Sequence, residues 1–162
     1  MDLKGNLALT GILTGAAYKH ACVATLSAPY SIGDFGGGFE KVPLASTFDP
    51  QSNFSNANSW YVAPVTGLYL ILTRIRPDDF VDDGSGNQVS YGQGAHTSNG
   101  DGSFFMWGLT VPSTGPTYSR NGLVNFRIAS FSAGAQIRMF AYADTAIAIA
   151  DAEMNIFLLG AA

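Results

Sequence analysis

Two candidate strands meet in the stretch Ser59-Trp-Tyr-Val-Ala-Pro-Val-Thr-Gly-Leu-Tyr-Leu-Ile-Leu-Thr-Arg-Ile75. The first, Ser59–Val65, and the second, Gly67–Ile75, are short runs of aliphatic and aromatic residues bounded by Ser, Pro and Gly, as strands usually are. The second run is apolar on both faces of an extended chain, and Met154–Leu159 shares this feature. In a sheet with one wet face, such strands predict contact with another subunit.

The same short-strand pattern recurs on either side of this stretch. Helical periodicity is almost absent, and the Ala-rich segment Asp144–Asn155 is the only candidate helix. The dipeptide Asn121-Gly122 tolerates the positive φ angles of a type I′ turn and predicts a hairpin. So many short strands in 162 residues predict an all-β sandwich or jelly roll with two facing sheets. The other candidate strands are Ala21–Ala28, Phe39–Thr47, Ser103–Val111, Thr117–Arg120, Leu123–Phe131, Gln136–Ala143 and Glu153–Leu159.

The charge content is low for a domain that stands alone in water. Only 12% of the residues are Asp, Glu, Lys or Arg, about half of the usual 25% or so. We therefore expect part of the surface to be covered by other copies of the chain or by a partner. The net charge of −4, with no basic run, argues against nucleic acid as that partner. No apolar run is long enough for a membrane-spanning helix, so no membrane partner is expected.

No catalytic motif is present, which predicts a protein that is not an enzyme. His20 and Cys22 would share one face of a strand, and a thiolate–imidazole pair could be built from them. We expect instead a small buried thiol beside an incidental histidine, with the reactive pair as the alternative. Cys22 is the only cysteine, which excludes an intramolecular disulfide.

The segment Pro77–Gly102 reads as a long acidic, glycine-rich loop that could form a small hairpin of its own. We expect no resident cofactor. Calcium is the alternative here, because Asp82 and Asp83 begin a run of hard oxygen ligands on a flexible backbone. A solvated acidic turn explains the same residues without a metal.

Four sequence elements together resemble the complement globular-head and tumour-necrosis-factor-like superfamily. The stretch Tyr61-Val-Ala-Pro-Val-Thr-Gly-Leu-Tyr69 is similar to the family's Pro-x-x-Gly-x-Tyr signature, and Val42–Asp49 resembles its short strand ending in Phe-Asp. Ser132–Met139 and Met154–Leu159 resemble its later strands. Ala135 stands where the family usually has Asp, the last strand lacks the family's Ser-Gly step, and no collagen-like stalk is present.

The resemblance covers residues 21–162, and we interpret residues 20–162 as a jelly-roll head domain. It implies a β-sandwich of two antiparallel sheets that assembles into a homotrimer around a threefold axis. By position in the family pattern, the resemblance places Tyr69, Ile71, Phe157 and Leu159 at the trimer interface.

Residues 1–19 read as a separate N-terminal arm. The stretch Gly5-Asn-Leu-Ala-Leu-Thr-Gly-Ile-Leu-Thr-Gly15 resembles short repeats of phage fibre proteins. An extended arm cannot bury its apolar side chains against itself, so it needs the head, other copies or a partner. The arm is therefore expected to anchor or intertwine the chain through Leu3, Leu7, Leu9, Ile12 and Leu13.

Together these features predict a phage virion protein on the capsid surface, either a trimeric decoration (cement) protein or a head fibre. Its partners would be its own copies and the major capsid protein or another virion protein. The alternatives are the receptor- or glycan-binding tip of a tail fibre and a secreted trimeric recognition module.

Overall fold

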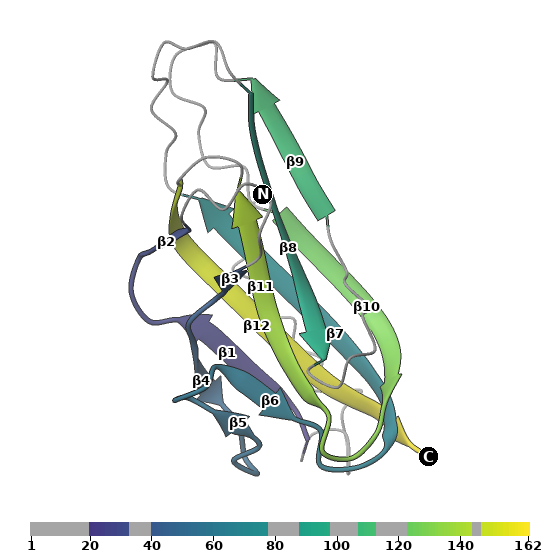
Figure 1. The fold of residues 1–162 in the computed structure, drawn as a ribbon. Helices are drawn as coiled ribbons and strands as arrows, with labels where there is room; N and C mark the ends of the chain where they lie inside the picture. Colours follow the sequence, from purple (N-terminus) through teal and green to yellow (C-terminus); the bar gives the residue numbers. More distant parts are fainter. Residues whose placement is uncertain (1–19, 33–39, 78–87, 98–106, 113–122, 144–146) are drawn as a thin grey trace, which may run out of the picture.

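The computed structural model describes residues 20–32, 40–77, 88–97, 107–112, 123–143 and 147–162, and these form two antiparallel sheets packed face to face (Figure 1). Sheet A has the strand order β10-β7-β12-β1-β4, with β2 also paired to β12. Sheet B has the order β5-β6-β11-β8-β9, with β3 also paired to β11. The predicted two-sheet jelly-roll sandwich is confirmed.

Strand bounds follow the short-run pattern of the sequence. Sheet A contains β1 (Cys22–Leu26), β2 (Tyr30–Ile32), β4 (Leu44–Phe48), β7 (Gly67–Pro77), β10 (Leu123–Phe131) and β12 (Ile147–Ala161). Sheet B contains β3 (Glu40–Lys41), β5 (Phe54–Ser55), β6 (Trp60–Val62), β8 (Gln88–Thr97), β9 (Trp107–Pro112) and β11 (Gln136–Ala143). No helix among the described residues is long and apolar enough to cross a membrane.

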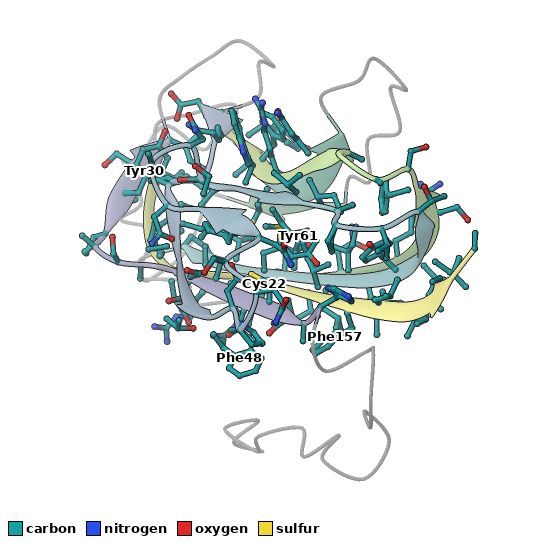
Figure 2. The ribbon with its side chains drawn as sticks, turned by 90° about the horizontal axis from the view of Figure 1, so that it is seen from below. Cys22, Tyr30, Phe48, Tyr61 and Phe157 are labelled. Carbon is teal, nitrogen blue, oxygen red and sulfur yellow. The ribbon has the colours of Figure 1, made fainter. Side chains whose placement is uncertain are left out.

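The core lies between the sheets and is made by alternate residues of their long strands. On β7 the buried side chains are Tyr69, Ile71, Thr73 and Ile75, and β11 contributes Ile137, Met139 and Ala141. Successive side chains of a strand point to opposite faces, so one half of each strand enters the core. Tyr61 of β6 and Cys22 of β1 lie between the two layers in Figure 2, and neither is exposed to solvent.

The Ala-rich segment expected as a candidate helix is a strand instead. Ile147 and Ile149 are buried, and after an irregularity near Asp151 the buried positions become Ala152 and Met154. The irregularity shifts the alternation by one residue and hides the period of two in the sequence. The only candidate helix, Asp144–Asn155, is therefore a strand from Ile147 onward.

The single strand expected over Phe39–Thr47 is divided at Pro43. Glu40–Lys41 pairs with β11 in sheet B, whereas Leu44–Phe48 pairs with β1 in sheet A. Proline has no backbone N–H to donate, which favours such a break. The chain passes here from one sheet to the other, and the Tyr30 hydroxyl donates to Glu40 Oε2 at 2.7 Å across the same end of the sandwich.

Part of the expected acidic loop Pro77–Gly102 is also a strand. Gln88–Thr97 forms β8, which lies between β11 and β9 in sheet B. The sequence hides it because glycine and polar residues occupy most of its positions, among them Gly92 and Gly94. Thr117–Arg120 and the expected Asn121-Gly122 turn lie outside the described residues.

Gly67 marks a close approach between β7 and the end of β12. A Cβ atom at this position would overlap the Gly160 carbonyl oxygen and would lie 2.8 Å from Leu158 Cδ1. By contrast, a Cβ atom at Gly160 would meet nothing within 4 Å. Glycine at residue 67 is thus required by packing and not by a turn, and it opens the long central strand.

Candidate interaction surface

The outward face of sheet A is apolar and exposed in the single chain. Phe126 pairs with Leu72 and Ile128 pairs with Leu70, so these outward side chains stand side by side on β10 and β7. Phe126 is 71% exposed, Val124 64% and Ile128 52%. Soluble proteins rarely leave several large apolar side chains adjacent and open to water. This face therefore has the character of an interface.

The same face continues across β12. Phe157 pairs with Leu70, and Figure 2 shows Phe157 and Phe48 pointing away from the sandwich interior. Leu68 and Leu159 are exposed at 41% and 44%. Outside β8 and β9, all five large hydrophobic side chains that are exposed in the described part of the chain belong to this region of sheet A. We call it the outer apolar face and define it as Leu68, Leu70, Leu72, Val124, Phe126, Ile128, Phe157 and Leu159.

A polar cluster borders the outer apolar face on β7 and β12. The Arg74 Nη2 atom lies 2.9 Å from Asp151 Oδ2 and 3.0 Å from Glu153 Oε2. Asn155 Nδ2 donates to Glu153 Oε1 at 2.6 Å. Such partly exposed ion pairs add at most about 1 kcal/mol each to stability. Their position shows where the outer apolar face ends, because these charged side chains pair with one another at its edge.

Two of the four residues expected at a trimer interface lie in the core. Tyr69 is fully buried, donates its hydroxyl to the Val65 carbonyl at 2.7 Å, and has its ring 5.9 Å from that of Phe131. Ile71 is 2% exposed in the same core. Strand alternation turns both side chains into the core of one chain, where they cannot reach another subunit. The prediction that Tyr69 and Ile71 lie at a trimer interface is therefore corrected. Phe157 and Leu159 lie on the outward side.

Sequence reasoning missed Val124, Phe126 and Ile128 as surface residues. These apolar residues alternate with Asn125 and Arg127, and an alternating strand normally turns its apolar set inward. Here the order is reversed, since Asn125 is 8% exposed whereas Phe126 is 71% exposed. The alternation was visible in the sequence, and only the assignment of its two faces needed the structure.

The Cys22 thiol near the start of β1 is a buried core group. Cys22 is fully buried, and burial, with a smaller effect of the Asp49 carboxylate, raises the pKa of its thiol to about 12. At neutral pH the sulfur is thus a protonated core atom, and a thiol is not the nucleophilic form. The His20 carbonyl accepts a hydrogen bond from the Tyr61 hydroxyl at 3.0 Å.

The remaining site residues expected from the sequence are outside the part of the chain described. This holds for the arm residues Leu3, Leu7, Leu9, Ile12 and Leu13 and for the calcium candidates Asp82 and Asp83. Among the described residues, no group of three or more His, Cys, Asp or Glu side chains is arranged to hold a metal ion.

The sandwich, its strand order and its exposed sheet face define the class of protein as a jelly-roll module with a large apolar surface. No protein-family model and no curated protein sequence matches the chain. Solved structures do match it over most of its length. Eiger TNF from S. frugiperda is 13% identical, with a TM-score of 0.63 over 88% of this chain and 94% of that one.

Two further structures agree with this likeness. The globular domain of zebrafish complement 1qA is 10% identical, with a TM-score of 0.60 over 89% of this chain and 99% of that one. Murine APRIL at pH 5.0 is 13% identical, with a TM-score of 0.56 over 86% and 99%. The chain therefore has the tumour-necrosis-factor-like and complement-head jelly-roll fold, and the resemblance stated from the sequence is confirmed for the fold.

Proposed function

We propose that the chain is a non-enzymatic module that works as a homotrimer and covers the outer apolar face between its own copies. The observation that carries this proposal is the exposure of Phe126, Val124 and Ile128 beside Leu70 and Leu72. Burying a large apolar side chain contributes about 1.5–3 kcal/mol. Several such side chains on one sheet provide a driving force for association that a monomer would leave unused.

Threefold symmetry is what the superfamily resemblance implies for this surface. In a closed trimer, each copy turns the same apolar strands towards one axis. All three apolar faces are then covered, and no further copy can add to the assembly. A stable interface buries roughly 800 Å² per partner. The eight residues of the outer apolar face span three neighbouring strands and would form the apolar centre of such an interface.

We further propose a virion role, in which the trimer decorates a capsid at threefold or quasi-threefold sites or forms a head fibre. The N-terminal arm supports this role through its likeness to phage fibre repeats. Leu3, Leu7, Leu9, Ile12 and Leu13 would supply apolar contacts to the major capsid protein or another virion protein. Binding of this kind needs a broad footprint and no catalytic group.

Deletion of residues 1–18 tests the arm separately from the trimer. Sedimentation of the full chain and of the truncated chain with purified capsids should show occupancy for the full chain alone, while both remain trimers in solution. Full capsid occupancy by the truncated trimer would show that the arm is not the anchor.

The second candidate is a recognition module, either the tip of a tail fibre or a secreted trimer. Particles that lack the chain separate the two roles. Loss of capsid thermal stability on deletion supports decoration, whereas intact particles that no longer adsorb to host cells support a fibre tip.

A further inference from the structure

The opposite side of the sandwich, on sheet B, carries a row of side chains unlike that of sheet A. On β11, Ile137, Met139 and Ala141 point into the core, so Gln136, Arg138, Phe140 and Tyr142 point outward, and all four are partly exposed. Trp60 of β6 pairs with Arg138, and Lys41 of β3 pairs with Phe140. Aromatic rings and cations therefore stand together on one face.

Arg138 is held in place on this face by its neighbours. Its guanidinium carbon lies 4.2 Å from the centroid of the Trp60 ring, and its Nη2 atom donates to Gln136 Oε1 at 2.7 Å. Its Nε atom is buried and has no hydrogen-bond partner. The ion pairs found among the described residues belong to Arg74, so Arg138 has no carboxylate partner there. A guanidinium that its neighbours hold in place, and that has no carboxylate partner among the described residues, can bind an anion through its remaining N–H groups.

Glycines of β8 pair with the two aromatic residues of β11. Gly94 pairs with Phe140 and Gly92 pairs with Tyr142, and Gly92 in turn pairs with Gly108 of β9. Glycine has no side chain, so these three outward positions of β8 and β9 add nothing of their own above the sheet. The β8 positions paired with the two rings therefore carry no side chain.

The charges on this face are opposite to those of the chain as a whole. The chain has a net charge of −4, yet the charged side chains at outward positions of β3, β6 and β11 are Lys41 and Arg138, both positive. Flat aromatic rings stack on the C–H faces of sugars, and a guanidinium binds a carboxylate through paired hydrogen bonds. A neutral protein segment would use the rings but not the two cations.

From these features we propose that the outward face of β11, with Trp60, Arg138, Phe140, Tyr142 and Lys41, is a binding surface for an acidic polysaccharide. The sugar carboxylate binds Arg138 and Lys41, and neighbouring sugar rings lie along Phe140 and Tyr142. From Arg138 to Tyr142 the strand rises by about 13 Å, which fits a short oligosaccharide and not a single sugar. Because this face is on the opposite sheet from the outer apolar face, the inference does not depend on the proposed trimer.

Calorimetric titration of the full chain tests this surface. The acidic probes are polygalacturonate, polysialic acid and hyaluronan, the neutral probe is dextran, and the acidic peptide probe is polyglutamate. We expect binding of at least one acidic polysaccharide, no binding of dextran, and weaker or absent binding of polyglutamate. Arg138→Gln should weaken polysaccharide binding by about tenfold or more, as expected for loss of a hydrogen-bonded charge.

Arg127→Gln is the matched control, because it removes the same charge from exposed β10 on sheet A. It should leave polysaccharide affinity unchanged, and light scattering of every variant reports separately on assembly. The inference is overturned if no acidic polysaccharide binds, if Arg138→Gln binds as the unaltered chain does, or if Arg127→Gln weakens binding equally. Equal or tighter binding of polyglutamate would overturn it in favour of an acidic protein partner.

Discussion

Replacement of Phe126 by aspartate should dissociate the proposed trimer. Phe126 is 71% exposed in the single chain, and full burial of a phenylalanine side chain contributes about 1.5–3 kcal/mol. Burial of the exposed part would then contribute about 1–2 kcal/mol per copy, or about 3–6 kcal/mol per trimer. Since each 1.4 kcal/mol changes an equilibrium constant tenfold, Phe126→Asp should weaken assembly by about two to four orders of magnitude.

Sedimentation velocity across a dilution series is the assay for this effect. The matched control is Ala133→Asp, which adds the same charge at an exposed position in the turn between β10 and β11 that is not part of the outer apolar face. Circular dichroism should show the same β-sheet content for both variants, because Phe126 contributes little to the core of one chain. The reasoning is refuted if Phe126→Asp sediments like the unaltered chain at every dilution, or if Ala133→Asp dissociates to the same extent.

Three further predictions concern the sandwich itself. Gly67→Ala should lower the free energy of unfolding by about 1–3 kcal/mol through overpacking, whereas Gly160→Ala should change it by less than about 0.5 kcal/mol; equal denaturant midpoints would contradict the close approach. Cys22, whose thiol pKa burial raises to about 12, should not react with a thiol reagent at pH 8 until the chain is unfolded, and rapid native labelling would show that it is accessible. Burial, with the hydrogen bond to Glu40, raises the pKa of Tyr30 to about 12 from 10.0. The folded state therefore holds this proton more tightly, and the stabilisation is complete below pH 10 and lost as the pH rises towards 12. Between pH 10 and pH 12, the melting temperature of Tyr30→Phe should fall less than that of the unaltered chain. Equal falls would argue against a stabilising role for the Tyr30 proton.

The fold was predictable because the long strands are locally consistent. Leu123–Phe131 and Gln136–Ala143 have the bounds expected from their composition and flanking turn residues. The ordered set of family-like elements then indicated how the strands would be arranged. β8 and the first part of β12 were not predictable, because glycine in one and a shifted alternation in the other conceal the period of two.

The candidate surface was predictable in kind but not in its residues. Low charge and strands that are apolar on both faces indicated a covered surface. Which residues form this surface depends on which side chains of each strand face outward. A shift of one residue exchanges the inward-facing and outward-facing side chains. Tyr69 and Ile71 face the core whereas Leu70 and Leu72 face outward. Pairing with neighbouring strands decides which side chains face outward, and the sequence of a single strand does not.

The mass of the unaltered chain in solution is the most direct test of the proposal that the outer apolar face is covered by other copies. Light scattering coupled to size-exclusion chromatography, at micromolar concentration, should give three chains of 17.0 kDa each, about 51 kDa. A mass of 17.0 kDa at every concentration would contradict the account, because Phe126, Val124 and Ile128 would then remain exposed to water in the working protein.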